Sequence, residues 1–81
     1  MTDKKLGILA IAVQKRAETA PNVNALLSQY GEKIIARMGV PHHERNLNIV
    51  SVVIESDEQD ILSLIDKLSA LKNVQVKSLT V

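Results

Sequence analysis

Two long apolar segments constrain the fold of this chain more than any other feature. Residues 6–13 (LGILAIAV) and 47–55 (LNIVSVVIE) are apolar at most positions instead of at alternate ones. An uninterrupted run of this length, rich in β-branched side chains, is typical of a strand that is covered on both faces. Each run is far shorter than the ~20 apolar residues that cross a bilayer. The sequence therefore predicts two central strands of a sheet and no membrane span.

Length and composition narrow the class of protein. The 81 residues predict one domain, residues 1–81, and the net charge of +1 with 46% hydrophobic residues argues against intrinsic disorder. Tyr30 is the only aromatic residue, which excludes an aromatic stacking platform for single-stranded nucleic acid. The absence of Cys excludes disulfides, thiolate metal sites and thiol nucleophiles. The charges form no basic block, so we expect no direct nucleic-acid binding.

The first helix and the second strand are expected between the two apolar segments. Thr19 is a candidate helix cap, with Pro21 in the first turn and Gly31 at the C-terminal end. Residues 33–38 then alternate as a strand that Gly39 and Pro41 end, and residues 40–46 form a loop. The helix presents one apolar face, at the spacing i, i+3, i+4, i+7, made by Val23, Leu26, Leu27 and Tyr30.

A second helix and a last strand follow the second apolar segment. Residues 56–59 (SDEQ) have the form of a capping box, and Asn73 suits a left-handed helix end. Residues 74–81 alternate as a strand. The clearest helical stripe in the chain lies between them and is made by Ile61, Leu64, Ile65, Leu68 and Leu71.

The element order β-α-β-β-α-β predicts an α+β, ferredoxin-like (ACT-like) sandwich. Its four-stranded antiparallel sheet carries both helices on one face, and its first and third strands lie in the centre. Those are the two strands formed by the apolar segments. The set Leu9, Ile11, Val13, Val50, Val52 and Ile54 is expected to face the helices.

The other face of this sheet is also expected to be apolar, and such patches usually mark interfaces. We therefore predict a homo-oligomer, a dimer or a tetramer, built on this face or on the strand edges beside it. We assign eight residues to this face: Ile8, Ala10, Ala12, Ile35, Arg37, Ile49, Ser51 and Val53.

Few residues are candidates for a ligand site. Lys15 and Arg16 precede the first helix, where backbone amides favour an anion, although a solvated loop is the simpler interpretation. Arg37 could clamp an anionic ligand or pair with Glu55. His42 and His43 are the only histidines; adjacent residues of an extended loop point in different directions, so a polar loop is favoured over a metal site.

No other chemistry is indicated. There is no catalytic triad motif, no carboxylate pair in an apolar setting and no Gly-rich phosphate loop, so we expect neither an enzyme nor a bound cofactor. Lys4 and Lys5 precede the first apolar segment, but Gln14, Lys15 and Arg16 follow it where a secretory signal would be cleaved. We therefore expect a cytoplasmic protein.

Several strings of the sequence resemble the iron-only hydrogenase system regulators, over residues 6–79. They are 8–13 (ILAIAV), 23–27 (VNALL), 34–41 (IIARMGVP) and the apolar spacing from Ile61 to Lys77. The most specific parts are the Arg-x-Gly-x-Pro run at 37–41 and the Val-x-Val-Lys ending at 74–77. The resemblance implies a domain related to ACT-type regulatory domains and to the C-terminal domain of nickel-responsive repressors. Such relatives bind small effectors or metals at subunit interfaces, but this chain lacks the repressors' Cys ligand, and we expect no DNA-binding segment.

The sequence thus favours a regulatory or ligand-sensing domain that acts as a homo-oligomer, with a small-molecule effector. The alternative is a protein-interaction or scaffold module with a partner protein and no ligand.

Overall fold

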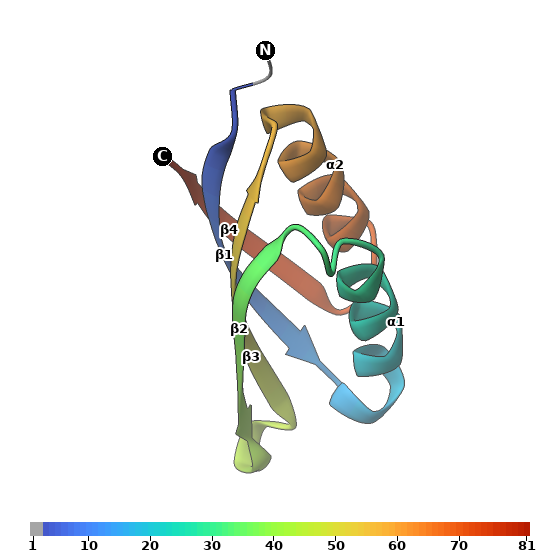
Figure 1. Ribbon diagram of the computed structural model, residues 1–81. Coiled ribbons are helices and arrows are strands. Elements are labelled where there is room, and N and C mark those ends of the chain that lie inside the picture. Colours follow the sequence, from blue (N-terminus) through green and yellow to red (C-terminus); the bar gives the residue numbers. More distant parts are fainter. Residues whose placement is uncertain (1–2) are drawn as a thin grey trace.

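The computed structural model describes residues 3–81 and contains one antiparallel sheet with two helices on one side of it (Figure 1). The elements follow the predicted order, and the strand order in the sheet is β2-β3-β1-β4. The central strands β1 and β3 are therefore the two apolar segments, as predicted. The elements are β1 (Lys5–Gln14), α1 (Arg16–Gln29), β2 (Ile34–His42), the short 3₁₀ turn η1 (His43–Arg45), β3 (Leu47–Ser56), α2 (Glu58–Ser69) and β4 (Val74–Thr80).

The core lies between the sheet and the helices. The side chains of Leu9, Ile11, Val52 and Ile54 are fully buried there, and Val13 and Val50 are almost so, which confirms the predicted helix-facing set. Helix α2 contributes Ile61, Leu64 and Leu68, each at 0% exposure, and α1 contributes Val23 and Leu27. The aliphatic residues thus supply the core almost alone.

Helix α1 begins earlier than predicted. Its first residue is Arg16 and Lys15 is its N-cap, so Thr19 is a buried residue of the helix and not its cap. The amides of Glu18 and Thr19 both donate to the Lys15 carbonyl, which closes the first turn before Pro21 is reached. The prediction was wrong because Pro21 is tolerated inside this helix. The helix does end near Gly31, whose amide donates to the Ser28 carbonyl.

Strand β2 is longer than predicted. It continues through Gly39 and Pro41 to His42, and only residues 43–46 remain outside the strands of this hairpin. A proline lacks the N–H that a central strand requires, but β2 is an edge strand, where the missing donor is tolerated. The predicted end of the strand was therefore wrong.

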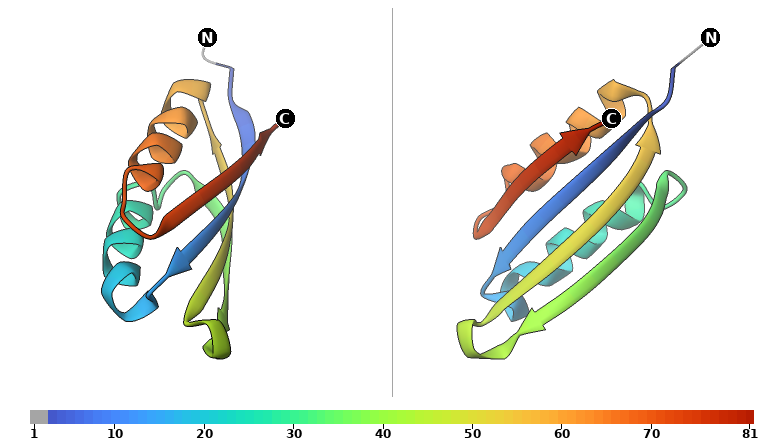
Figure 2. Two further views of the ribbon diagram at one scale, coloured as in Figure 1. Left: turned by 180° about the vertical axis from the view of Figure 1, so that it is seen from behind. Right: turned by 90° about the vertical axis from the view of Figure 1, so that its left-hand side faces the viewer.

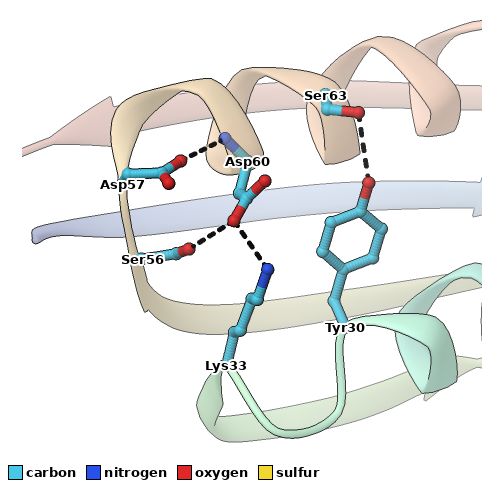
Figure 3. A network of polar contacts seen from close by, with 6 residues as sticks. All are labelled: Tyr30, Lys33, Ser56, Asp57, Asp60 and Ser63. Atoms are coloured by element: carbon cyan, nitrogen blue, oxygen red, sulfur yellow. Dashed lines mark hydrogen bonds and ion pairs between the residues drawn. The ribbon is translucent and has the colours of Figure 1, made fainter. Parts of the chain in front are cut away.

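A polar network fixes the start of helix α2 (Figure 3). Asp57, not Ser56, is the N-cap, and its carboxylate accepts a 2.8 Å hydrogen bond from the Asp60 amide. The Asp60 carboxylate in turn accepts hydrogen bonds from Lys33 at 2.6 Å and Ser56 at 3.0 Å. The Lys33 and Ser56 hydrogen bonds hold the pKa of Asp60 below its usual value, and the contact with Asp60 raises the pKa of Lys33. The network ties α2 to the turn before β2.

Tyr30, the only aromatic residue and the C-cap of α1, contacts helix α2. The Tyr30 hydroxyl donates to the Ser63 hydroxyl at 3.2 Å (Figure 3). Lys67 Nζ lies 5.4 Å from the centroid of the Tyr30 ring. The hydrogen bond with Ser63 and the neighbouring Lys67 lower the pKa of Tyr30. Asn73 has the predicted left-handed backbone, with φ of 67°, but α2 ends at Ser69 with Ala70 as its C-cap, so Asn73 lies in the α2–β4 turn and does not cap the helix.

Candidate functional site

Two segments that are distant in sequence meet at one end of the sheet. The β1–α1 junction, at Lys15 and Arg16, lies beside the η1 turn between β2 and β3. The Lys15 amide donates to the Asn46 carbonyl at 3.1 Å. A second contact joins Arg16 Nη1 to His43 Nδ1 at 3.2 Å. The fold thus brings the β1–α1 junction and the η1 turn together.

The backbone on both sides of this site is left-handed. Lys15 and Asn46 each have φ of 52°, a conformation that residues other than glycine adopt uncommonly. At Asn46 the side chain tolerates it, but a lysine pays a steric penalty of about 1–2 kcal/mol. The Lys15–Asn46 hydrogen bond joins these two residues directly and holds both loops in place.

A cavity of about 390 Å³ opens between the loops, lined by Gln14, Lys15, Arg45, Asn46 and Leu47. Lys15, Arg16 and Arg45 contribute three positive charges to residues 14–16 and 43–46, against one negative charge from Glu44. The first turn of α1, where the helix dipole favours negative charge, starts at the same point. Lys15 and Arg45 line this cavity, whereas Arg16 and His43 contact each other outside its lining. We call these four residues the basic notch.

The contact between Arg16 and His43 has a defined direction. A guanidinium only donates hydrogen bonds, so Nδ1 of His43 is the acceptor in this 3.2 Å contact.

The remaining predicted ligand residues lie outside the notch. His42 pairs with Leu47 in the strand ladder, whereas His43 lies in η1 and contacts Arg16. Arg37 pairs with Val52, and its Nη2 donates a 2.8 Å hydrogen bond to Asn24 Oδ1 of helix α1. Arg37 therefore neither pairs with Glu55 nor joins the histidines. Sequence reasoning missed Arg45, whose approach to Lys15 depends on the hairpin geometry.

The sheet face opposite the helices forms a second candidate site, which we call the open face. No element within residues 3–81 covers it; Figure 2 shows the strands in front of both helices in its right-hand view. The strand register aligns its side chains in rows across the sheet, including Leu79, Ile8, Val53 and Ala36 in one row and Lys77, Ala10, Ser51 and Met38 in the next. A third row is Gln75, Ala12, Ile49 and Val40.

Six of the predicted interface residues occupy the open face, but the assignment of Arg37 to it was wrong. A β-bulge between Ile34 and Ala36 adds a residue to β2, and the register with β3 skips Ile35. Beyond the bulge, Ala36, Met38 and Val40 share the open face, and Arg37 lies on the helix side. One extra residue exchanges the two faces of a strand, and no sequence signal marked it.

A mostly apolar cavity of about 460 Å³ adjoins the open face along β4. Its lining includes Ala10, Ala12 and Ile49 of the open face together with Val74 and Ser69. Within residues 3–81, no group of three or more His, Asp or Glu side chains is arranged to hold a metal ion. Neither described helix has the length and apolar character needed to cross a membrane.

Comparisons with known proteins agree with this fold. The chain is similar to a protein whose solved structure is described as uncharacterized protein TM1266 from Thermotoga maritima, with 34% sequence identity and a TM-score of 0.93. The match covers 98% of this chain and 99% of that one. A comparison with curated proteins gives no match. Residues 5–78 match the model of the TM1266-like family, described as "Iron-only hydrogenase system regulator, putative". The chain therefore belongs to the TM1266-like family.

Proposed function

We propose that this chain is a non-enzymatic regulatory domain that senses a small anionic ligand in the basic notch and acts as a homo-oligomer. The observation that carries the proposal is the meeting of Lys15 and Arg16 with His43 and Arg45, from two loops 27 residues apart at the Arg16–His43 contact. The description of the family as a regulator supports the same role, with an iron-only hydrogenase system as the regulated target.

The chemistry of the notch favours a phosphate or carboxylate group. Arginine guanidinium groups bind such anions through paired, charge-assisted hydrogen bonds, and a helix N-terminus adds amide donors. Arg16 is half-buried and Arg45 is exposed, so an anion could reach both from solvent. A ligand would replace the direct Arg16–His43 contact with a bridge between the two loops.

The position of the notch suggests how binding would be transmitted. His43 belongs to the notch, and its neighbour His42 ends strand β2 on the open face. Lys15 likewise directly follows β1, whose Ala10 and Ala12 lie on that face. A ligand that favours one arrangement of these strand ends would shift the population of assembled and free chains.

Calorimetric titration with inorganic phosphate and with citrate tests the ligand site. Binding of either anion to the wild-type chain is expected, and Arg16→Ala should weaken it at least about tenfold because one charge-assisted contact is lost. Arg37→Ala is the matched control, because it removes the same charge on the helix side of β2 and should leave the affinity unchanged.

Two outcomes would contradict the ligand proposal. One is a wild-type chain that binds neither anion, which would favour the alternative of an interaction module without a ligand. The other is an affinity that Arg16→Ala and Arg37→Ala reduce equally, because binding would then depend on net charge alone.

A further inference from the structure

The open face presents an unusual amount of aliphatic surface for a chain of this size. Among the large hydrophobic side chains exposed in residues 3–81, five belong to the open face. A half-solvated antiparallel sheet normally carries polar side chains on its solvent side. The exposed fractions of these five are 38% for Leu6, 44% for Ile8, 63% for Met38, 49% for Val40 and 62% for Leu79.

The size of the open face matches that of a dimer interface. Its strands have 10, 9, 10 and 7 residues. At about 3.3 Å per residue and about 4.8 Å between strands, they span roughly 550 Å² of the sheet plane. Side chains that protrude from this plane raise the accessible area further. Two such faces would bury more than about 1,000 Å² in total, the size at which specific interfaces begin.

The shape of the open face is compatible with the packing of a second sheet against it. Small side chains at Ala10, Ser51 and Ala36 lie among larger ones, and a shallow depression of about 170 Å³ opens there between Ile8 and Met38. Packed sheets lie about 10 Å apart with interdigitated side chains, so large residues of one copy would fill the depression of the other.

The charge distribution favours a copy of the same chain over other occupants. On the open face Glu55 lies beside Leu6 and Lys77 beside Ala10, so the face carries one acidic and one basic side chain in different rows. A net charge of +1 gives two copies little mutual repulsion. A lipid surface would require basic and aromatic residues around the patch, but the only aromatic side chain, Tyr30, lies in the helix layer.

We propose that the open face is a self-association interface on which a second copy of this chain packs sheet against sheet. The inference rests on the homo-oligomeric part of the proposed function and not on the anion site, so it stands or falls separately from ligand binding. It places Met38, Val40 and Leu79 in the interface, which the sequence did not indicate, and it distinguishes face packing from pairing of strand edges.

Sedimentation equilibrium of the full chain at roughly 1–100 µM tests this interface. The wild-type chain is expected to form dimers or larger even-numbered assemblies. Met38→Glu should raise the dissociation constant of the dimer at least about 100-fold, because it buries an unpaired charge in the apolar contact. Leu62→Glu is the matched control, because Leu62 is similarly exposed, at 50%, but lies on helix α2. That variant should associate like the wild-type chain.

Circular dichroism checks that the Met38→Glu variant is folded, because its loss of association is informative only if it retains the wild-type secondary structure. If it does not, Ser51→Glu in the same row supplies the test, because Ser51 is exposed at the centre of the open face. A wild-type chain that stays monomeric throughout the range would overturn the proposal. So would assembly that folded Met38→Glu or Ser51→Glu leaves unchanged, because strand-edge pairing would then explain it.

Discussion

Replacement of Leu64 by Ala is expected to remove about 3 kcal/mol from the free energy of unfolding, within the 2–5 kcal/mol range of such core truncations. Leu64 is completely buried on the inner side of α2, where it belongs to the cluster that joins both helices to the sheet. A domain of this length has a total stability of about 4–12 kcal/mol, so the substitution would consume a large part of it.

Urea denaturation at one fixed protein concentration measures the effect, because association makes the apparent stability concentration-dependent. Leu62→Ala, two residues earlier on the same helix, is the control. Leu62 is half exposed and lies outside the core cluster, so its loss should cost only about 0.5 kcal/mol. Equal losses for the two variants would mean that α2 is not packed on the sheet through Leu64.

Replacement of Gly7 by Val should destabilise the fold by about 3 kcal/mol or more through overpacking. Gly7 lies in β1 opposite Ile54, on the side that faces helix α2. A Cβ atom at this position would approach the Cγ2 atoms of Ile54 and Ile61 to 3.0 Å each. Both isoleucines are fully buried, so neither can move aside without disturbing the core.

Gly39→Val is the control for this substitution, since Gly39 is also a strand glycine. The nearest atom to its added Cβ would be Asn48 Oδ1 at 4.0 Å, so the side chain has room. We expect Gly39→Val to be neutral or slightly stabilising, because valine favours strands and glycine does not. Thermal unfolding compares the two; if Gly7→Val prevents folding, Gly7→Ala provides a milder version of the same contact. A Gly7→Val chain as stable as the wild type would contradict the close packing of β1 on α2.

The sequence alone predicted the elements whose signals are local and periodic. The apolar runs that became β1 and β3 and the stripe of α2 each determine a face without reference to distant residues. The helix-facing set from Leu9 to Ile54 was correct for that reason. The sheet order followed, because only the central strands needed to be apolar on both sides.

The errors fall where tertiary context overrides a local signal. Pro41 was predicted to end the strand, but β2 lies at the sheet edge, where a residue without an N–H is tolerated. The bulge near Ile35 reverses the predicted facing of the β2 residues that follow it. Arg37 therefore lies on the helix side, where it donates to Asn24, and Met38 and Val40 are exposed on the open face. The basic notch depends on a contact between residues 16 and 43, and no spacing along the chain encodes it.

We propose that the basic notch and the open face are coupled, so that an anion bound in the notch changes association through the open face. Sedimentation velocity of the wild-type chain, over a concentration series with and without saturating inorganic phosphate, measures this coupling. Coupling between sites typically amounts to about a 5–150-fold change in an equilibrium constant. We expect phosphate to change the dissociation constant of the dimer at least about fivefold, in either direction. If the dissociation constant stays the same in a chain that calorimetry shows to bind phosphate, the two sites are not coupled.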